Sequence, residues 1–354
     1  MKSYYRHILL TSAVLLAAAA CTKTVPEGPQ VTDMQINICA SEGLTKSSLK
    51  NGTFNPTGTK SLLDANTFST AGNRIKVYDY VDGTAYIDDQ IGPDFSGSPL
   101  AEATDGVWPF ENGPHQWTPG THKFFGWLSK DVSSETDLTP ESLISSGFSY
   151  ADQKLTVPAI TMGPTTPQFD FMYSDIFTTE PINTPVQLKF SHLFCAVSFG
   201  IVNDASSDVS ISNFNVTLYT NKKATVDYSG STVAVNYTNT ASSPATFRTS
   251  SGGTLSGMSG GVSDMWVNAF APTDTERQYI LMWPQTKDEL SACKINIKYT
   301  LNDQEYNQSL AFPEMELNAG QKYHFDIFIA DKAPIRINYL VVDWDPIKND
   351  VTFE

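Results

Sequence analysis

The second half of the chain is a series of short segments in which apolar and polar residues alternate, and this pattern constrains the fold more than any other feature. Alternation with a period of two predicts strands that bury one face. Turn residues and no helical segments separate them, which favours a β-sandwich of antiparallel sheets. The segments are 186–202, 211–220, 263–272, 278–285, 293–301, 306–312, 322–330 and 335–345.

The first half carries fewer such segments, with long intervals rich in Ser, Thr, Gly and Pro between them. Residues 31–41 alternate Met34, Ile36 and Ile38 with more polar neighbours, which predicts a half-buried strand. Further strands are expected at 74–81, 121–128 and 153–160. No period holds from 42 to 73, so a long loop is expected there. The whole pattern predicts an all-β chain.

Residues 1–20 have the composition of a lipoprotein signal peptide. A short basic segment with Lys2 and Arg6 precedes an apolar run, and Cys21 directly follows a run of alanines. The run is too short to span a bilayer. A cysteine in this place resembles the lipobox of bacterial lipoproteins, so we expect Cys21 to carry a lipid. An ordinary signal peptide with a chance cysteine is the other interpretation.

The length suits two domains, each able to bury a core of its own. After the signal peptide, we expect a tether at 21–30, an N-terminal β-sandwich domain at 31–182 and a C-terminal β-sandwich domain at 186–354. The two prolines of residues 181–185 suggest the linker.

The charge of the mature chain excludes some partners. Without Lys2 and Arg6, 21 basic residues face 38 acidic ones, a formal net charge of −17. Such a chain repels nucleic-acid phosphates, and it lacks a basic patch for anionic lipid. Metal-ligand spacing is missing from the scattered histidines of the mature chain, so neither a metal nor another cofactor is expected; these histidines are His115, His122, His192 and His324.

Three further cysteines follow Cys21, at 39, 195 and 293. Cys195 and Cys293 both lie in strand-like segments, so a disulfide between them is one interpretation. Buried thiols that act as small apolar residues are the other.

Two catalytic patterns lack the context that they require. Residues 257–261 match G-x-S-x-G around Ser259, but a Gly- and Ser-rich loop surrounds them instead of a strand and a helix. Residues 47–50 match S-x-x-K with no partner motif downstream. Neither pattern predicts an active site.

Two segments with aromatic residues are candidates for glycan contact. Asp343 and Asp345 flank Trp344 and point the same way on a strand, which would suit a sugar. Core packing of Trp344 explains the same alternation. The aromatics of 108–117 could likewise touch a glycan or pack back on their own sheet.

Five segments, in this order along the chain, resemble a known family. They are "TFSTAGNRIKVYDYVDG" with "WTPGTHKFFGW", then "VQLKFSHLFCAVSFGI", then "LNAGQKYHFDIFI" before "VVDW". Together with the lipobox they are similar to the fimbrillin-like lipoproteins (Mfa-like, type V pilins) of anaerobic gut and oral bacteria. The resemblance implies two tandem transthyretin-like β-sandwiches, no enzyme activity, and a place in a fimbria on the outer membrane, with adhesion as the biological role.

The resemblance also implies assembly with other pilin subunits after a protease removes the first strand, and strand exchange into the vacated groove. The family's cleaved arginine closely follows that strand, whereas this chain offers Lys46, Lys60 and, next to the second strand, Arg74. Cleavage at a lysine is expected, or else no cleavage and a lasting lipid anchor. A host protein or glycan is the partner that adhesion would imply.

The last strand segment is the candidate for strand exchange. It presents an apolar stripe suited to a groove in another subunit, formed by Ile335, Ile337, Tyr339 and Val341. It could equally be the last strand of its own sandwich. A surface lipoprotein that binds glycans for polysaccharide uptake is the alternative to a pilin, and a glycosidase is a third hypothesis.

Overall fold

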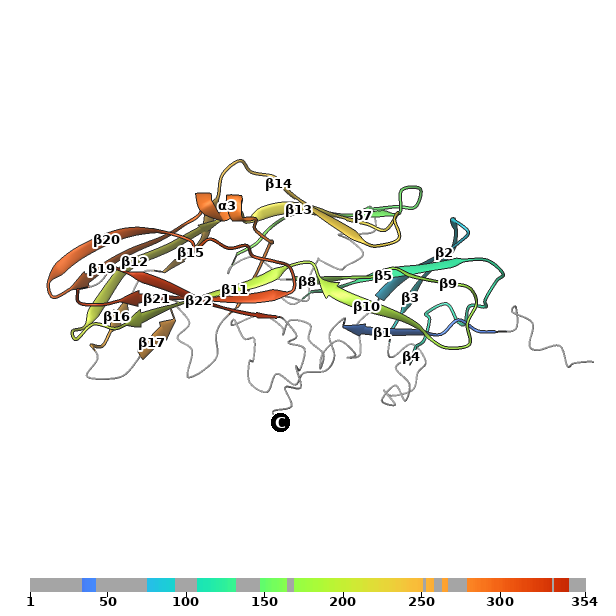
Figure 1. Ribbon diagram of the computed structural model, residues 1–354, viewed down its shortest axis with the longest axis horizontal. Helices are drawn as coiled ribbons and strands as arrows, with labels where there is room; N and C mark the ends of the chain where they lie inside the picture. Colours follow the sequence, from blue (N-terminus) through green and yellow to red (C-terminus); the bar gives the residue numbers. More distant parts are fainter. Residues whose placement is uncertain are drawn as a thin grey trace, which may run out of the picture.

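The structure is a computed structural model that describes residues 34–42, 75–92, 107–131, 147–163, 169–250, 253–257, 263–266, 279–332 and 334–343. Within these ranges the chain forms four β-sheets, arranged along an elongated molecule (Figure 1). The all-β class predicted from the sequence is confirmed. The division into two tandem transthyretin-like domains at 182 and 186 stays a prediction.

The first sheet has eight strands and lies at one end of the molecule (Figure 1). Its order is β3-β2-β5-β8-β10-β1-β4, with β9 beside β5. Its strands are β1 (Ile38–Glu42), β2 (Ile75–Val81), β3 (Thr84–Ile91), β4 (Val107–Trp108), β5 (His122–Asp131), β8 (Phe169–Ser174), β9 (Phe177–Thr179) and β10 (Val186–His192).

Two five-stranded sheets occupy the opposite end. One has the order β17-β11-β21-β22 with β18 beside β11, and the other β15-β12-β19-β20 with β16 beside β12. The strands of the former are β11 (Cys195–Asn203), β17 (Ser263–Trp266), β18 (Ile280–Met282), β21 (Gln321–Ile329) and β22 (Arg336–Asp343). Those of the latter are β12 (Val209–Leu218), β15 (Ala245–Ser250), β16 (Gly253–Leu255), β19 (Lys294–Leu301) and β20 (Gln304–Ala311).

A four-stranded sheet of order β14-β13-β7-β6 joins segments from both halves of the sequence. Its strands are β6 (Phe148–Ser149), β7 (Lys154–Thr161), β13 (Asn221–Asp227) and β14 (Ala234–Asn239). Because β7 pairs with β13, and β10 pairs with β1 and β8, hydrogen bonds cross the expected linker at 181–185 in both directions.

Three expectations were wrong in detail. The segment 186–202 is two strands in different sheets: β10 alternates buried and exposed residues, β11 is buried along its whole length, and Leu193 and Phe194 lie between them. The sheets are not purely antiparallel, since β1 pairs parallel with β10 and β11 with β21. The described ranges also contain a helix that was not expected, α3 (Lys287–Ala292), whose N-cap Thr286 forms a capping box with Glu289.

Alternation along the first sheet builds two hydrophobic cores. On β5, Phe124 and Leu128 face a smaller cluster, whereas Phe125 and Trp127 face a larger one that continues through β7, β11, β12 and β21. Successive side chains of a strand point to opposite faces, so this sheet is buried on both sides. Its strands are consequently rich in aromatic residues on each face.

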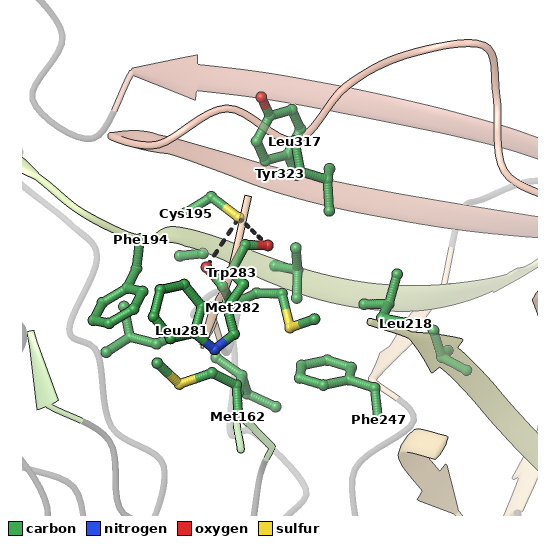
Figure 2. Close-up of a cluster of buried hydrophobic side chains, with 14 of the residues drawn as sticks. Met162, Phe194, Cys195, Leu218, Phe247, Leu281, Met282, Trp283, Leu317 and Tyr323 are labelled. Atoms are coloured by element: carbon green, nitrogen blue, oxygen red, sulfur yellow. Dashed lines mark hydrogen bonds between the residues drawn. The ribbon is translucent and has the colours of Figure 1, made fainter. Parts of the chain in front are cut away.

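The larger cluster joins the sheets around Trp283, whose indole Nε1 donates to the Ile160 carbonyl at 2.8 Å. Figure 2 shows Cys195 beside it, where the thiol donates to the carbonyls of Met282 at 3.3 Å and Trp283 at 3.7 Å. Cys195 and Cys293 are free and buried, so they form no disulfide. Burial raises the pKa of Cys195 above its ordinary value and that of Cys293 to about 12, which keeps both thiols protonated.

Gly126 allows β2 and β5 to approach closely. A Cβ atom at this position would lie 2.4 Å from the backbone carbonyl oxygen of Lys76 on β2. The Gly126 carbonyl also accepts a hydrogen bond of 3.0 Å from the buried Tyr228 hydroxyl. The site therefore has no room for a side chain.

We predict that Gly126→Ala lowers the free energy of unfolding by about 1–3 kcal/mol, the usual cost of overpacking. Gly230→Ala is the control, because a Cβ atom there meets nothing closer than 3.4 Å. Urea denaturation followed by tryptophan fluorescence measures both. Equal stability of the two variants would contradict the role assigned to Gly126.

Candidate assembly surfaces

The first described strand, β1, is held by backbone hydrogen bonds to elements far away in sequence. Along one edge it pairs in parallel with β10, from Ile38 opposite Val186 to Glu42 opposite Phe190. Along the other edge it makes a short antiparallel pair with β4. Residues 43–74 separate β1 in sequence from β2. A cut in this segment would therefore release β1 and leave the chain from β2 onward covalently intact.

The segment before β1 is fixed by the loop at 111–121. The Ile36 N–H donates to the His115 carbonyl at 2.8 Å, and the Trp117 N–H donates to the Met34 carbonyl at 2.9 Å. Ile36 and Ile38 are 2% and 0% exposed in the smaller cluster. Burial of each side chain is worth about 1.5–3 kcal/mol, and its loss would leave an apolar groove along β10.

Two histidine–aspartate pairs position this loop. His122 Nδ1 lies 2.5 Å from Asp79 Oδ2, and its Nε2 lies 2.9 Å from the Thr118 carbonyl. His115 Nε2 lies 2.8 Å from Asp89 Oδ2, whose partner oxygen accepts from Asn112. The His122 ring packs edge to face on Trp117, with centroids 4.7 Å apart. The sequence alone shows no role for these histidines, because the aspartates that they contact lie on other strands.

The Asp79–His122 pair is fully buried. Burial raises the pKa of Asp79 to about 6, although the hydrogen bonds to His122 and from the Lys123 N–H act in the opposite direction. The folded state therefore binds a proton at Asp79 more tightly than the unfolded chain does.

The last described strand, β22, lies at the edge of its sheet and pairs antiparallel with β21. Ile335 and Ile337 pack partly buried against the larger cluster. Tyr339 and Val341 are 45% and 38% exposed, and Leu340 between them is 42% exposed. The predicted apolar stripe thus starts on its own sandwich and continues as an exposed stretch with apolar side chains on both faces. Its role in strand exchange stays a prediction.

A buried serine, a buried histidine and a half-buried aspartate form a network across the parallel pair of β11 and β21. Ser198 Oγ lies 2.7 Å from His324 Nδ1, and His324 Nε2 lies 2.7 Å from Asp326 Oδ1. Catalysis needs a serine that a substrate can reach, and Ser198 is 0% exposed. This network joins two strands, and no motif in the sequence predicts it.

Other residues considered in the sequence fall outside the described ranges; they are Cys21, Lys46, Lys60, Arg74, Ser259 and Trp344. Cys39 lies in β1, but its side chain is not among those described. Two aromatics considered for glycan contact, Phe110 and Trp117, are 8% and 1% exposed and pack back on their own sheet. In the described ranges, no group of three His, Cys, Asp or Glu side chains could bind a metal ion, and no helix is long and apolar enough to cross a membrane.

The model of one protein family, described as fimbrillin-like, matches residues 59–344. The chain belongs to the fimbrillin-like family. A search of curated protein sequences gave no match. This fimbrillin-like chain is also similar in fold to several solved structures.

A fimbrial protein from Bacteroides vulgatus is 14% identical, with a TM-score of 0.50 over 88% of this chain and 99% of its own. A fimbrial assembly protein from Parabacteroides distasonis is 11% identical, with a TM-score of 0.38 over 88% and 95%. The C-terminally truncated tip fimbrial protein Mfa3 from Porphyromonas gingivalis is 9% identical, with a TM-score of 0.36 over 88% and 99%. The likeness to the first of these supports the fold.

We predict that Asp79 makes stability depend on pH. A carboxyl whose folded pKa is raised adds stability that is fully present below its unfolded pKa and is lost as pH rises through about 6. Asp79→Asn should therefore cost about 2 kcal/mol more at about pH 4 than at about pH 8. The exposed turn residue Asp303 provides the control Asp303→Asn, and chemical denaturation at both pH values gives the comparison. Parallel pH profiles for the wild type and Asp79→Asn would refute it.

Proposed function

We propose that this chain is a structural subunit of a bacterial surface fimbria, delivered as a lipoprotein through Cys21 and assembled by strand exchange. The observation that carries the proposal is the position of β1. This strand pairs through backbone hydrogen bonds with β10 and β4, and residues 43–74 separate it in sequence from β2. Membership of the fimbrillin-like family supports it.

Removal of β1 would produce a site for another strand. The β10 backbone would lose its parallel partner, and the cluster around Val186 and Leu188 would lose Ile36 and Ile38. Unpaired backbone groups and an apolar stripe are what an extended segment from a second subunit can satisfy by β-augmentation. In this proposal, cleavage at Lys46, Lys60 or Arg74 frees β1, and the exposed part of β22 supplies subunit contacts.

The proposal excludes a catalytic role and assigns the partners. Other pilin subunits would occupy the vacated groove, and the outer membrane would hold the precursor through the lipid on Cys21. Adhesion to a host protein or glycan would be a property of the assembled fimbria. The burial of Phe110 and Trp117 gives no support to glycan capture by those two residues.

The first test asks whether β1 leaves after cleavage. We expect trypsin to cut the folded chain first between residues 43 and 74, and the fragment with β1 to dissociate when a peptide of residues 335–353 is supplied. Ile38→Ser should speed dissociation about 10–100-fold, because it removes most of a buried apolar side chain. Asn37→Ser, at an exposed neighbour, should not. Mass spectrometry of the released fragment gives the rate.

N-terminal sequencing of the protein extracted in native form from the cell surface is the companion measurement. A start within 43–75 supports processing. A start at lipidated Cys21 in an unpolymerised chain would overturn assembly by strand exchange. A first tryptic cut elsewhere, for example at Arg248, would remove 43–74 as the processing segment.

The second test concerns the β22 edge. Tyr339→Lys with Val341→Lys should abolish heat-sensitive polymer ladders, because charges on an edge strand oppose pairing. The monomer should lose no more than about 0.5 kcal/mol, since both side chains are exposed. Gln308→Lys on β20, another edge strand, is the control. Normal ladders in the double variant would exclude this part of β22 from the subunit contact.

A further inference from the structure

A lysine, an asparagine and a glutamate meet where β13, β14 and α3 converge. Lys222 on β13 and Asn239 on β14 stand directly opposite each other in the antiparallel pair. Their side chains reach the same carboxylate, that of Glu289 in the first turn of α3. None of the three belongs to the surfaces assigned above to assembly.

The contacts place the amine and the amide side by side. Lys222 Nζ lies 2.9 Å from Glu289 Oε1 and 2.7 Å from Oε2. Asn239 Nδ2 lies 2.5 Å from the same Oε1. Lys222 Nζ also donates to the Pro284 carbonyl at 2.6 Å. Both nitrogen atoms therefore contact the same carboxylate oxygen, which brings the lysine amine and the asparagine amide to one place in the structure.

Of the three side chains, that of Lys222 is buried, and those of Asn239 and Glu289 are half-buried. The Lys222 and Glu289 side chains are 3% and 16% exposed, and Trp283, Leu290 and Cys293 in the adjoining segments are buried. A buried ion pair is costly to desolvate, and the uncharged pair that results from proton transfer within it is cheaper to bury. Little water is therefore available to compete with Glu289 for the lysine amine.

A structural role explains two of the three residues. Glu289 accepts from the Thr286 N–H at 2.8 Å and so completes the capping box of α3, and Lys222 neutralises it. The role does not explain Asn239, whose Oδ1 is buried without a hydrogen-bond partner among the described residues. An unsatisfied buried acceptor destabilises a fold. Turning the amide round would place Oδ1 against Glu289 Oε1, a contact that requires a proton on Glu289.

We propose that the folded chain forms a covalent side-chain amide bond between Lys222 and Asn239, with Glu289 as the group that transfers the protons. The inference does not rest on the fimbrial function, since it concerns one chain by itself. It assigns a self-catalysed modification site to the hairpin of β13 and β14.

The chemistry balances without an added reagent. Lys222 gives a proton to Glu289, and the neutral Nζ attacks Cγ of Asn239, whose carbonyl electron pair moves onto oxygen. Glu289 returns its proton to Nδ2 and accepts the second proton from Nζ. The carbonyl re-forms, the Cγ–Nδ2 bond breaks, and ammonia leaves. One C–N bond replaces another, and nothing is oxidised or reduced.

The starting state is an ion pair. Burial alone would raise the pKa of Glu289, but the hydrogen bonds from Lys222 and Thr286 outweigh it and leave this pKa below its ordinary value. The first proton transfer then occurs over the 2.7 Å contact. Fixed neighbours react as if at very high concentration, which compensates for the weak electrophile that a carboxamide provides.

The test is the mass of the folded wild-type chain, measured after purification and again after prolonged incubation. We expect a mass lower by one ammonia than the sequence requires. Trypsin should yield a branched peptide in which residues 190–223 are joined to residues 224–248 through Lys222 and Asn239. The full unmodified mass, with a linear 224–248 peptide from folded protein, would overturn the proposal and leave an ion pair only. A slightly raised mass, from hydrolysis of Asn239 to aspartate, would overturn it as well.

Matched variants assign the roles. Lys222→Arg keeps the charge and the donors but has no nucleophilic amine, so it should fold, as circular dichroism can verify, and keep the full mass. Glu289→Gln should slow the loss of ammonia strongly. Lys223→Arg and Asn236→Ala change exposed neighbours on the same two strands and should leave the cross-link complete. Ammonia loss in Lys222→Arg would exclude Lys222 as the nucleophile and refute the bond.

Discussion

The structure depends on the segment that contains β10 and β11, because it takes part in sheets at both ends of the molecule. β10 pairs with β1 and β8 in the first sheet, and β11 pairs with β17, β18 and β21 in the second. At the junction, the Leu193 N–H donates to the Phe171 carbonyl and the Phe194 carbonyl accepts from Gly320. Leu193 and Phe194, which are both fully buried, thus connect the first sheet to the second.

This arrangement separates what must stay from what can leave. β11 is buried along its whole length and sits between partners on both sides, so it cannot dissociate without opening the larger cluster. Ile38 at the start of β1 and Ile36 just before it belong to the smaller cluster. The energetic cost of losing β1 is therefore local, and an incoming strand with apolar side chains at the same spacing could recover it.

Alternation in the sequence predicted the positions of many strands, but it did not predict which strands pair with each other. Predicted segments at 74–81, 293–301 and 322–330 match β2, β19 and β21 within a residue. Buried and half-buried residues alternate strictly along β19, whereas β2 and β21 also bury residues on their second face. β3 was missed because its exposed start carries few apolar residues. The turn before it, Asp82 and Gly83, has the positive φ angles of a tight hairpin, and an Asp-Gly pair is a signal that the sequence did offer.

Contacts between distant segments left no such signal. The parallel pairs β1–β10 and β11–β21 join residues that are more than a hundred positions apart, and period alone names no partner. The capping box of α3 was available as Thr286 and Glu289. The contact of Glu289 with Lys222 and Asn239 could not be predicted from the sequence. Three separate segments contribute one side chain each, and none of these residues is unusual in its own segment.

The direction of the linking strands has a mechanical consequence for a fimbria, if subunits join as proposed. β10, β11, β21 and β22 run along the long axis of the molecule (Figure 1), and β11–β21 and β21–β22 are hydrogen-bonded along nearly their whole lengths. A pull along that axis, entering at the β1 groove beside β10 and leaving at β22, would load these ladders in shear. Hydrogen bonds in shear share the load, whereas those at a peeled edge break one at a time. The Lys222–Asn239 hairpin lies in a different sheet, so its cross-link would protect the β14 edge from peeling and leave the pulling path unchanged.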